Sequence, residues 1–245
     1  MTSPLLFTPA TLGPVSLPNR IMISPMCQYS AHAGNVNGWH AAHLGSLALS
    51  GAGLLCVEAT AVSPEGRITP NCVGLYNNDN QQALEGVLDL LRAASPVRLM
   101  IQLAHAGRKA SSARPWEGGQ LLSPAEGGWE TLAPSALPHK EGEALPRAMT
   151  SAEIERVIAD FAAAARRARE LGFDAIELHA AHGYLLHQFL SPLANARDDD
   201  YGGSLENRMR LTLQVLEAVR AAAGNGMAVG VRLSATDWVD GGWDV

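Results

Sequence analysis

Short, nearly continuous apolar runs recur along the chain, separated by longer segments in which apolar residues follow helical spacing. The runs comprise residues 20–24, 53–59, 98–104, 175–179 and 228–233. Strands of a parallel sheet that are covered on both faces have this character. The pattern therefore predicts five strands, and their alternation with helices predicts an α/β fold.

Two of the intervening segments carry clear helix signals. Residues 150–153 read Thr-Ser-Ala-Glu, a capping box that predicts a helix start, and Gly172 is well placed to end that helix. A second helix is predicted to begin at Ser204, whose hydroxyl suits the N-cap, with Glu206 in the first turn. Weaker helical patterns cover residues 42–50 and 82–94.

The segment 107–149 differs from the rest because it is rich in Gly, Pro, Ser and Trp and has little periodicity. It follows the third predicted strand, where an active-site loop lies in parallel α/β barrels. No linker or repeat divides the chain, so we expect one domain over residues 1–245 with this long loop inside it.

Composition narrows the function classes. The chain has 245 residues and a net charge of −6, so no basic excess favours nucleic acid or an anionic membrane as a partner. No signal peptide or apolar run of about 20 residues is evident, and the three cysteines lack paired spacing. We expect a cytoplasmic protein. Because the common nucleotide-binding and hydrolase motifs are missing, any chemistry is expected at strand ends.

The fourth predicted strand ends in the densest group of candidates. His179, His182 and Tyr184 follow one another there, and His179 shares a strand face with Glu177. Two imidazoles and a phenol supply hydrogen-bond donors and a proton donor. A loop-capping or core histidine is the structural alternative. A zinc site is another alternative, and it would need a third ligand from residues 198–200.

The first strand ends in Ser24-Pro-Met-Cys27, followed by Tyr29. A cysteine in this position is reactive if its thiolate is stabilised, and inert if it is simply buried. Both readings remain open from the residues alone. Cys56 lies inside the second strand and is interpreted as core, and Cys72 is assigned no role.

The third and fifth strands carry polar residues within apolar runs. Gln102 lies in the third strand, which leads into His105 and the pair Arg108 and Lys109. Arg232 lies in the fifth strand. A strand arginine is costly to bury unless it has a carboxylate partner, such as Glu177, or an electron-rich ligand. The two explanations for Arg232 stand equally at this point.

These segments together resemble the Old Yellow Enzyme family, the FMN-dependent NADH:flavin oxidoreductases and NADPH dehydrogenases. The resemblance spans almost the whole chain in family order, and Cys27 and Tyr29 point to the xenobiotic-reductase-like branch with an active-site cysteine. The residues that carry it are 19–27, 57–62, 66–69, 102–109, 179–184 and 201–208.

The resemblance implies a (β/α)₈ TIM barrel with FMN at the carboxyl ends of its strands. Ser24, Pro25, Met26 and Cys27 would line the flavin, and Cys27 would tune its potential. The resemblance also places Ala59 and Gln102 on the isoalloxazine and Arg232 near its N1/O2 edge.

The resemblance further implies an ene-reductase. NADPH, or NADH, would reduce the flavin, which would then pass hydride to the β-carbon of an activated alkene such as an α,β-unsaturated carbonyl, or reduce a nitro compound. His179 and His182 would bind the substrate oxygen and Tyr29 would shape the pocket. Tyr184 would protonate the α-carbon. A homo-oligomer is compatible with the family.

Only five of the eight barrel strands can be assigned before Val245, so we expect about the first five β/α units of the barrel. The loops after strands seven and eight, which usually bind phosphate in such barrels, would lie beyond them. Two other functions stay open. One is a metal-dependent hydrolase that uses His179 and His182, and the other is a non-catalytic remnant that binds small aromatics.

Overall fold

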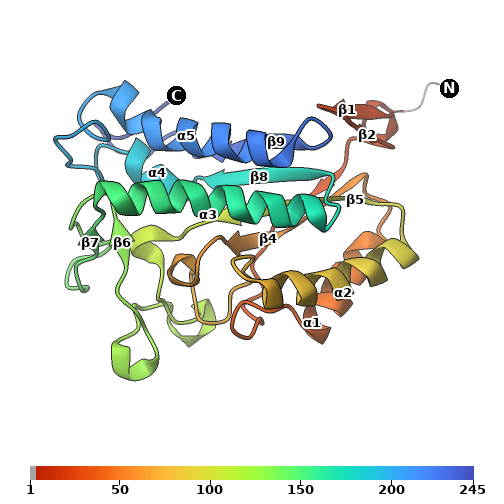
Figure 1. Cartoon of the computed structure of the whole chain (residues 1–245), viewed down its shortest axis with the longest axis horizontal. Helices are drawn as coiled ribbons and strands as arrows, with labels where there is room; N and C mark the ends of the chain where they lie inside the picture. Colours follow the sequence, from red (N-terminus) through yellow and green to blue (C-terminus); the bar gives the residue numbers. More distant parts are fainter. Residues whose placement is uncertain (1–3) are drawn as a thin grey trace.

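The computed structural model describes residues 4–245, and its centre is a curved sheet of five parallel strands (Figure 1). The order is β3-β4-β5-β8-β9, and neighbouring strands run in the same direction. The strands comprise β3 (Met22–Ile23), β4 (Leu54–Ala61), β5 (Arg98–Ala104), β8 (Ala175–Ala180) and β9 (Ala228–Leu233). This sequential parallel order is that of a section of a (β/α)₈ barrel, as predicted.

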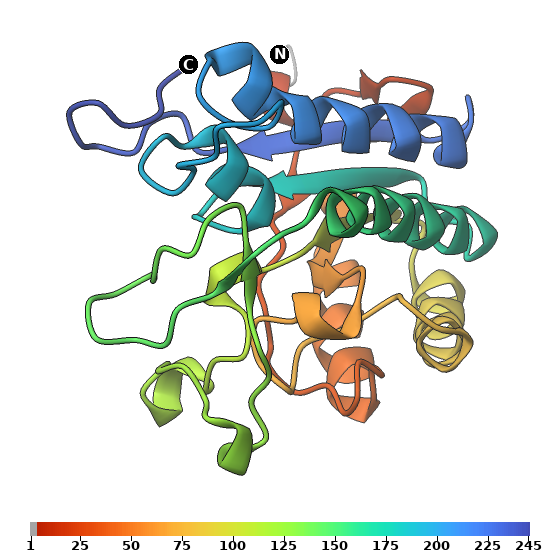
Figure 2. The same cartoon turned by 60° about the vertical axis from the view of Figure 1, so that its left-hand side comes forward.

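Helices cover one face of the sheet, as Figures 1 and 2 show. The main core lies between them and the strands, where residues such as Ile101 and Ile176 pack with Phe161 and Val215. These helices are α1 (Gly38–Ala48), α2 (Asn78–Ala94), α3 (Ser151–Glu170) and α5 (Leu205–Ala223). Because this face buries the aliphatic side chains, alternate residues of each strand face the other side, which corresponds to the barrel interior.

A small second core closes the amino ends of the strands. Its members include Cys56, Met100 and Ala228, and Val15 joins them from a hairpin of β1 (Ala10–Leu12) and β2 (Val15–Leu17). In Figure 1 this hairpin lies at the opposite end of β8 and β9 from the segment 107–149. The carboxyl ends of the strands therefore form the side on which a site can be built.

The predicted elements are present, with some differences at their ends. Segments 98–104 and 228–233 match β5 and β9, and Thr150 and Ser204 are the N-caps of α3 and α5. The first strand is shorter than predicted because Met22 and Ile23 alone pair with β4. The elements that were not predicted include the β1–β2 hairpin and α4 (Leu185–Leu190), whose six residues are all buried.

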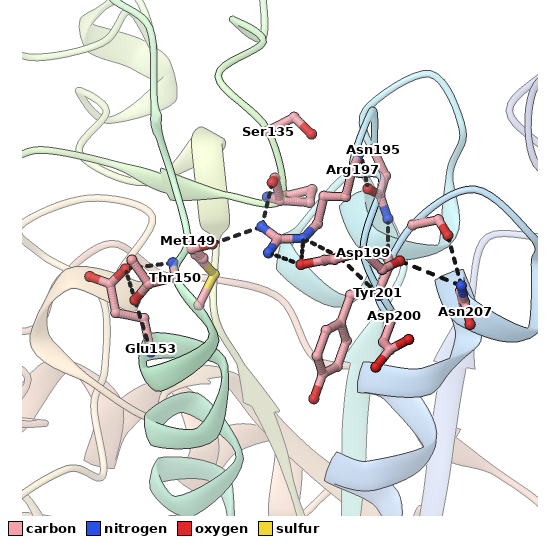
Figure 3. Close-up of polar contacts among 12 residues, drawn as sticks. Ser135, Met149, Thr150, Glu153, Asn195, Arg197, Asp199, Asp200, Tyr201 and Asn207 are labelled. Carbon is pink, nitrogen blue, oxygen red and sulfur yellow. Dashed lines mark hydrogen bonds and ion pairs between the residues drawn. The ribbon is translucent and has the colours of Figure 1, made fainter.

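The segment 107–149 is anchored at its base. Within it, β6 (Leu132–Ala133) pairs with β7 (Arg147–Ala148). Arg197, from the connection between α4 and α5, donates hydrogen bonds to the carbonyls of Pro134 (2.9 Å) and Met149 (2.7 Å) (Figure 3). Its guanidinium is held in turn by Asp199. Residues 134–148 therefore form a lobe whose two ends are tied to the same arginine.

None of the helices in the described part of the chain combines the length and the apolar character needed to cross a bilayer.

Candidate active site

The predicted polar residues meet at the carboxyl ends of the strands. On the interior side of the sheet, the Gln102 amide donates a 2.6 Å hydrogen bond to the carboxylate of Glu177, its register partner across β5 and β8. Two residues after Glu177 in β8, His179 is the register partner of Arg232 of β9. Parallel pairing thus arranges these side chains in rows at one edge.

Three aromatic rings at the end of β8 form a compact cluster. The ring centroid of His179 lies 4.7 Å from that of Tyr184 and 5.0 Å from that of His182, and all three rings meet edge to face. The His179 side chain is buried, His182 is exposed and Tyr184 is half-buried. The three rings therefore lie together at the end of β8, as the sequence predicted.

The backbone of His182 is held in an uncommon conformation. Its φ of 59° lies in the left-handed region, which a residue with a Cβ adopts only at some cost. The ammonium of Lys109 donates to the His182 carbonyl (2.8 Å), and the His182 N–H donates to the Ser234 hydroxyl (2.9 Å). The loops after β5 and β9 thus fix the loop after β8 between them.

Both imidazoles are neutral donors near pH 7. Burial, together with the nearby His182 and Arg232, lowers the pKa of His179 to about 3, and burial also lowers the pKa of His182. The Nδ1 of His179 accepts from the Ala181 N–H (3.3 Å), so its proton is assigned to Nε2. Burial raises the pKa of Tyr184 well above its usual range, which keeps the phenol protonated.

Cys27 lies in the stretch that follows β3, beside the end of β4. Burial raises the pKa of its thiol, and the nearby Cys72 and Glu58 act in the same direction, so the thiol is protonated near pH 7. The backbone of Ala59 contacts this thiol. The ring of Tyr29 lies 5.8 Å from that of Trp116, in the segment 107–149. Ser24 and Met26 are exposed in the stretch that follows β3.

The charge of Arg232 is not paired with a carboxylate in the described part of the chain. Among residues 4–245 no carboxylate forms an ion pair with it, and Glu177, the partner considered from the sequence, is bound to Gln102 instead. Its charge is nevertheless felt by Cys56 and by both histidines, which lie on the same side of the sheet. Of the two explanations for this strand arginine, the geometry favours an electron-rich ligand.

The remaining candidates lie elsewhere. His105 is fully buried, and a Cβ on Gly66 would come within 2.8 Å of its ring. Cys56 is in the core as predicted, and Cys72 is buried against Thr69. Asp199 binds Arg197, and no cluster of three or more potential metal ligands occurs in the described range 4–245.

Two buried residues beneath the site were not singled out from the sequence. Glu58, inside β4, accepts a hydrogen bond (3.0 Å) from the backbone N–H of Gln28, the residue after Cys27. Its other oxygen lies 3.6 Å from Nε2 of His40 in α1. A glutamate within the apolar run 54–61 could have been noticed in the sequence. Its partners could not have been predicted, because they come from distant parts of the chain. Through the bond to Gln28, Glu58 helps to fix the backbone that follows Cys27.

This carboxyl should make stability depend on pH. Burial raises the pKa of Glu58 from 4.5 to about 7, so the folded state favours its neutral form. The stabilising contribution is present at low pH and is lost as pH rises towards 7. Glu58→Gln cannot ionise, so its free energy of unfolding relative to the parent should rise between pH 5 and pH 8, by on the order of 3 kcal/mol.

Denaturant titrations of both proteins at the two pH values measure this difference. The matched control is Glu141→Gln, at an exposed glutamate, which should give no pH-dependent difference. A difference for Glu58→Gln that stays constant from pH 5 to pH 8 would contradict the assignment.

Comparison with known proteins shows the family of the chain. Residues 5–245 match the model of the NADH:flavin oxidoreductase / NADH oxidase family. An NADH:flavin oxidoreductase of Gibberella zeae is 47% identical over 238 residues, which cover 96% of this chain and 57% of the relative. An NADPH dehydrogenase of Bacillus velezensis is 44% identical, with 98% of this chain and 66% of the relative covered.

The fold is shared as well. The structure of morphinone reductase in complex with tetrahydroNAD superposes with a TM-score of 0.84 at 33% identity, over 99% of this chain and 67% of that one. The chain belongs to the NADH:flavin oxidoreductase / NADH oxidase family. The predicted family and the barrel fold are thereby confirmed. The chain spans 57 to 66% of the length of the two curated relatives.

Proposed function

We propose that this protein is an FMN-dependent NAD(P)H oxidoreductase that reduces activated alkenes. The observation that carries the proposal is Arg232, which faces the interior side without a carboxylate partner and lies beside two neutral histidines. A cation there suits a ring system that gains negative charge on reduction. Names of the relatives, an NADPH dehydrogenase and an NADH:flavin oxidoreductase, support the same chemistry.

The residues at the strand ends fit the ring portion of a flavin. They supply a buried amide, a guanidinium, a protonated thiol and apolar surface, all at one edge of the sheet. The group is drawn from β5, β9, β4 and the stretch after β3: Gln102, Arg232, Ala59, Ser24, Pro25, Met26 and Cys27. In this proposal Cys27 tunes the flavin potential through its protonated sulfur.

Bound FMN would supply the hydride chemistry, taking hydride from NADPH or NADH and passing it to the β-carbon of the alkene. The protein binds and orients the substrate. The Nε2–H of His179 and the ring of His182 donate hydrogen bonds to the substrate oxygen, where negative charge develops. The Tyr184 phenol supplies the proton for the α-carbon, and Tyr29 closes the pocket on the side of the segment 107–149.

A hydrolase that binds a metal through His179 and His182 is not favoured, because the described residues bring no third ligand to this pair. A non-catalytic remnant that binds aromatic ligands would keep the pocket and lack turnover. The three free cysteines and the small-molecule chemistry fit a cytoplasmic enzyme, which is part of the proposal.

Two measurements test the proposed function. The purified protein should show flavin absorbance, and it should oxidise NADPH or NADH when cyclohexenone is added. Cyclohexanone, which lacks the alkene, is the matched control substrate. A protein that takes up no FMN, or one that binds FMN without alkene-dependent oxidation of either nucleotide, would refute the proposal.

A further inference from the structure

A cavity lies next to the aromatic cluster, and Tyr184 is one of its lining residues. Its volume is about 340 Å³, and most of its lining residues come from the segment 107–149. Tyr29 and Tyr184 are both among the lining residues, so the cavity adjoins the proposed substrate pocket. The other lining residues come from positions 68–69, from the first part of the segment 107–149 and from the lobe 134–148.

The charges around this cavity are mostly positive. Arg108, Lys109 and Lys140 line it together with His139, and Glu143 is the acidic residue among the lining side chains. None of the three cations forms an ion pair with a carboxylate within the described residues. The carboxylate of Glu143 accepts from the backbone N–H of Lys140 (3.2 Å) and leaves the ammonium without an acidic partner.

Neutral carbonyls hold two of the cations in place. The Arg108 guanidinium donates to the carbonyls of Leu137 (3.1 Å) and Pro138 (3.2 Å). The Lys109 ammonium donates to the His182 carbonyl and lies 5.4 Å from the centroid of the Tyr184 ring. These contacts orient the side chains but do not cancel their charge. The positive potential of the cavity is therefore fixed by the fold.

The protonation behaviour agrees with this geometry. Burial lowers the pKa of Lys109, and Arg108 and Lys140 lower it further. Burial also lowers the pKa of His139, as do Lys109, Arg108 and Lys140, whereas Glu143 raises it. The cations thus repel one another across the cavity. An anion placed between them would relieve this repulsion.

We propose that this cavity binds an anionic group, a phosphate or a carboxylate, carried by a ligand whose reacting end lies at Tyr184. The assignment of that reacting end rests on the proposed function. Two ligands carry such a group: a nicotinamide nucleotide, through its phosphates, and an alkene substrate with an anionic substituent. The lobe 134–148 is tied at both ends by Arg197, so the site exists before the ligand arrives.

Direct binding of inorganic phosphate provides the first test, by isothermal titration calorimetry on the parent and three variants. Lys140→Gln should raise the dissociation constant up to about five-fold, the usual range for one exposed charge. Glu143→Gln should lower it, because it removes the acidic residue of the lining. Glu141→Gln, at an exposed site outside the lining, should leave it unchanged.

Kinetics with the flavin-loaded protein identify the source of the anion. NADPH carries one phosphate more than NADH. If the nucleotide supplies the anion, Lys140→Gln should lower the ratio of two kcat/KM values, the one for NADPH divided by the one for NADH. If the alkene supplies the anion, Lys140→Gln should lower the ratio of kcat/KM for an enone bearing a carboxylate to kcat/KM for cyclohexenone. The Glu141→Gln variant should keep both parental ratios.

The proposal is overturned if Lys140→Gln changes neither ratio, or if phosphate binds the parent and Lys140→Gln equally. Failure of the proposed function has a different signature: no flavin is bound and cyclohexenone is not reduced, while calorimetry still measures phosphate binding and its weakening in Lys140→Gln. The two failures are therefore distinguishable.

Discussion

Replacing both His179 and His182 by alanine should lower the rate of enone reduction by about 10²–10³-fold. Each imidazole would donate a hydrogen bond to the oxygen on which charge accumulates, in a partly dry site where such bonds are strong. In the same double variant, phenolic ligands should lose their long-wavelength charge-transfer band with the oxidised flavin, because the phenolate oxygen would occupy the same position.

The matched variants are the corresponding single and double changes to asparagine, whose amide keeps an N–H donor. They should recover much of the activity and of the band. Because burial lowers the pKa of His179 to about 3, its share of the effect should be independent of pH above about pH 5. An unchanged charge-transfer band in the double alanine variant would remove the pair from the substrate site.

Tyr184→Phe should slow the reduction of the alkene by about 10²–10⁴-fold, the usual contribution of a positioned general acid. Burial raises the pKa of this phenol, so it remains protonated and ready to donate. The ring of phenylalanine keeps the packing against His179 and removes only the hydroxyl. Oxidation of the nicotinamide nucleotide in the preceding half-reaction should proceed at the parental rate.

Stopped-flow measurement of each half-reaction separates the two effects. Tyr76→Phe is the matched control, because Tyr76 is a tyrosine outside the site that donates to the Ala33 carbonyl. Equal alkene-reduction rates for Tyr184→Phe and the parent would show that another group, or water, supplies the proton.

How much could be predicted from the sequence depends on how local each signal is. The strands β5 and β9 and the starts of α3 and α5 were predictable, because apolar runs and capping residues act within a few positions. The six-residue α4 is buried on every side, so it has no amphipathic pattern to detect. The three-residue strands of the β1–β2 hairpin are similarly too short to give a periodic signal.

The candidate site likewise contains contacts that the sequence predicts and contacts that it does not. His179, His182 and Tyr184 lie within six positions, so their grouping could be predicted from one strand end. The approach of Glu58 to His40 joins residues 18 apart, from a strand and a helix. The cationic cavity combines the end of β5 with the lobe 134–148. Contacts between residues so far apart depend on the connections between strands and helices. The spacing of apolar residues does not predict them.

The contacts of Arg197 at the base of the lobe 134–148 affect which sequence changes the lobe can tolerate. Arg197 takes the carbonyls of Pro134 and Met149 through backbone atoms, which every amino acid provides. The residues between these two points can therefore vary in identity, and even in number, at little cost to the barrel behind them. If the lobe contacts the ligand as proposed, substitutions in it would change ligand preference without altering the strand ends.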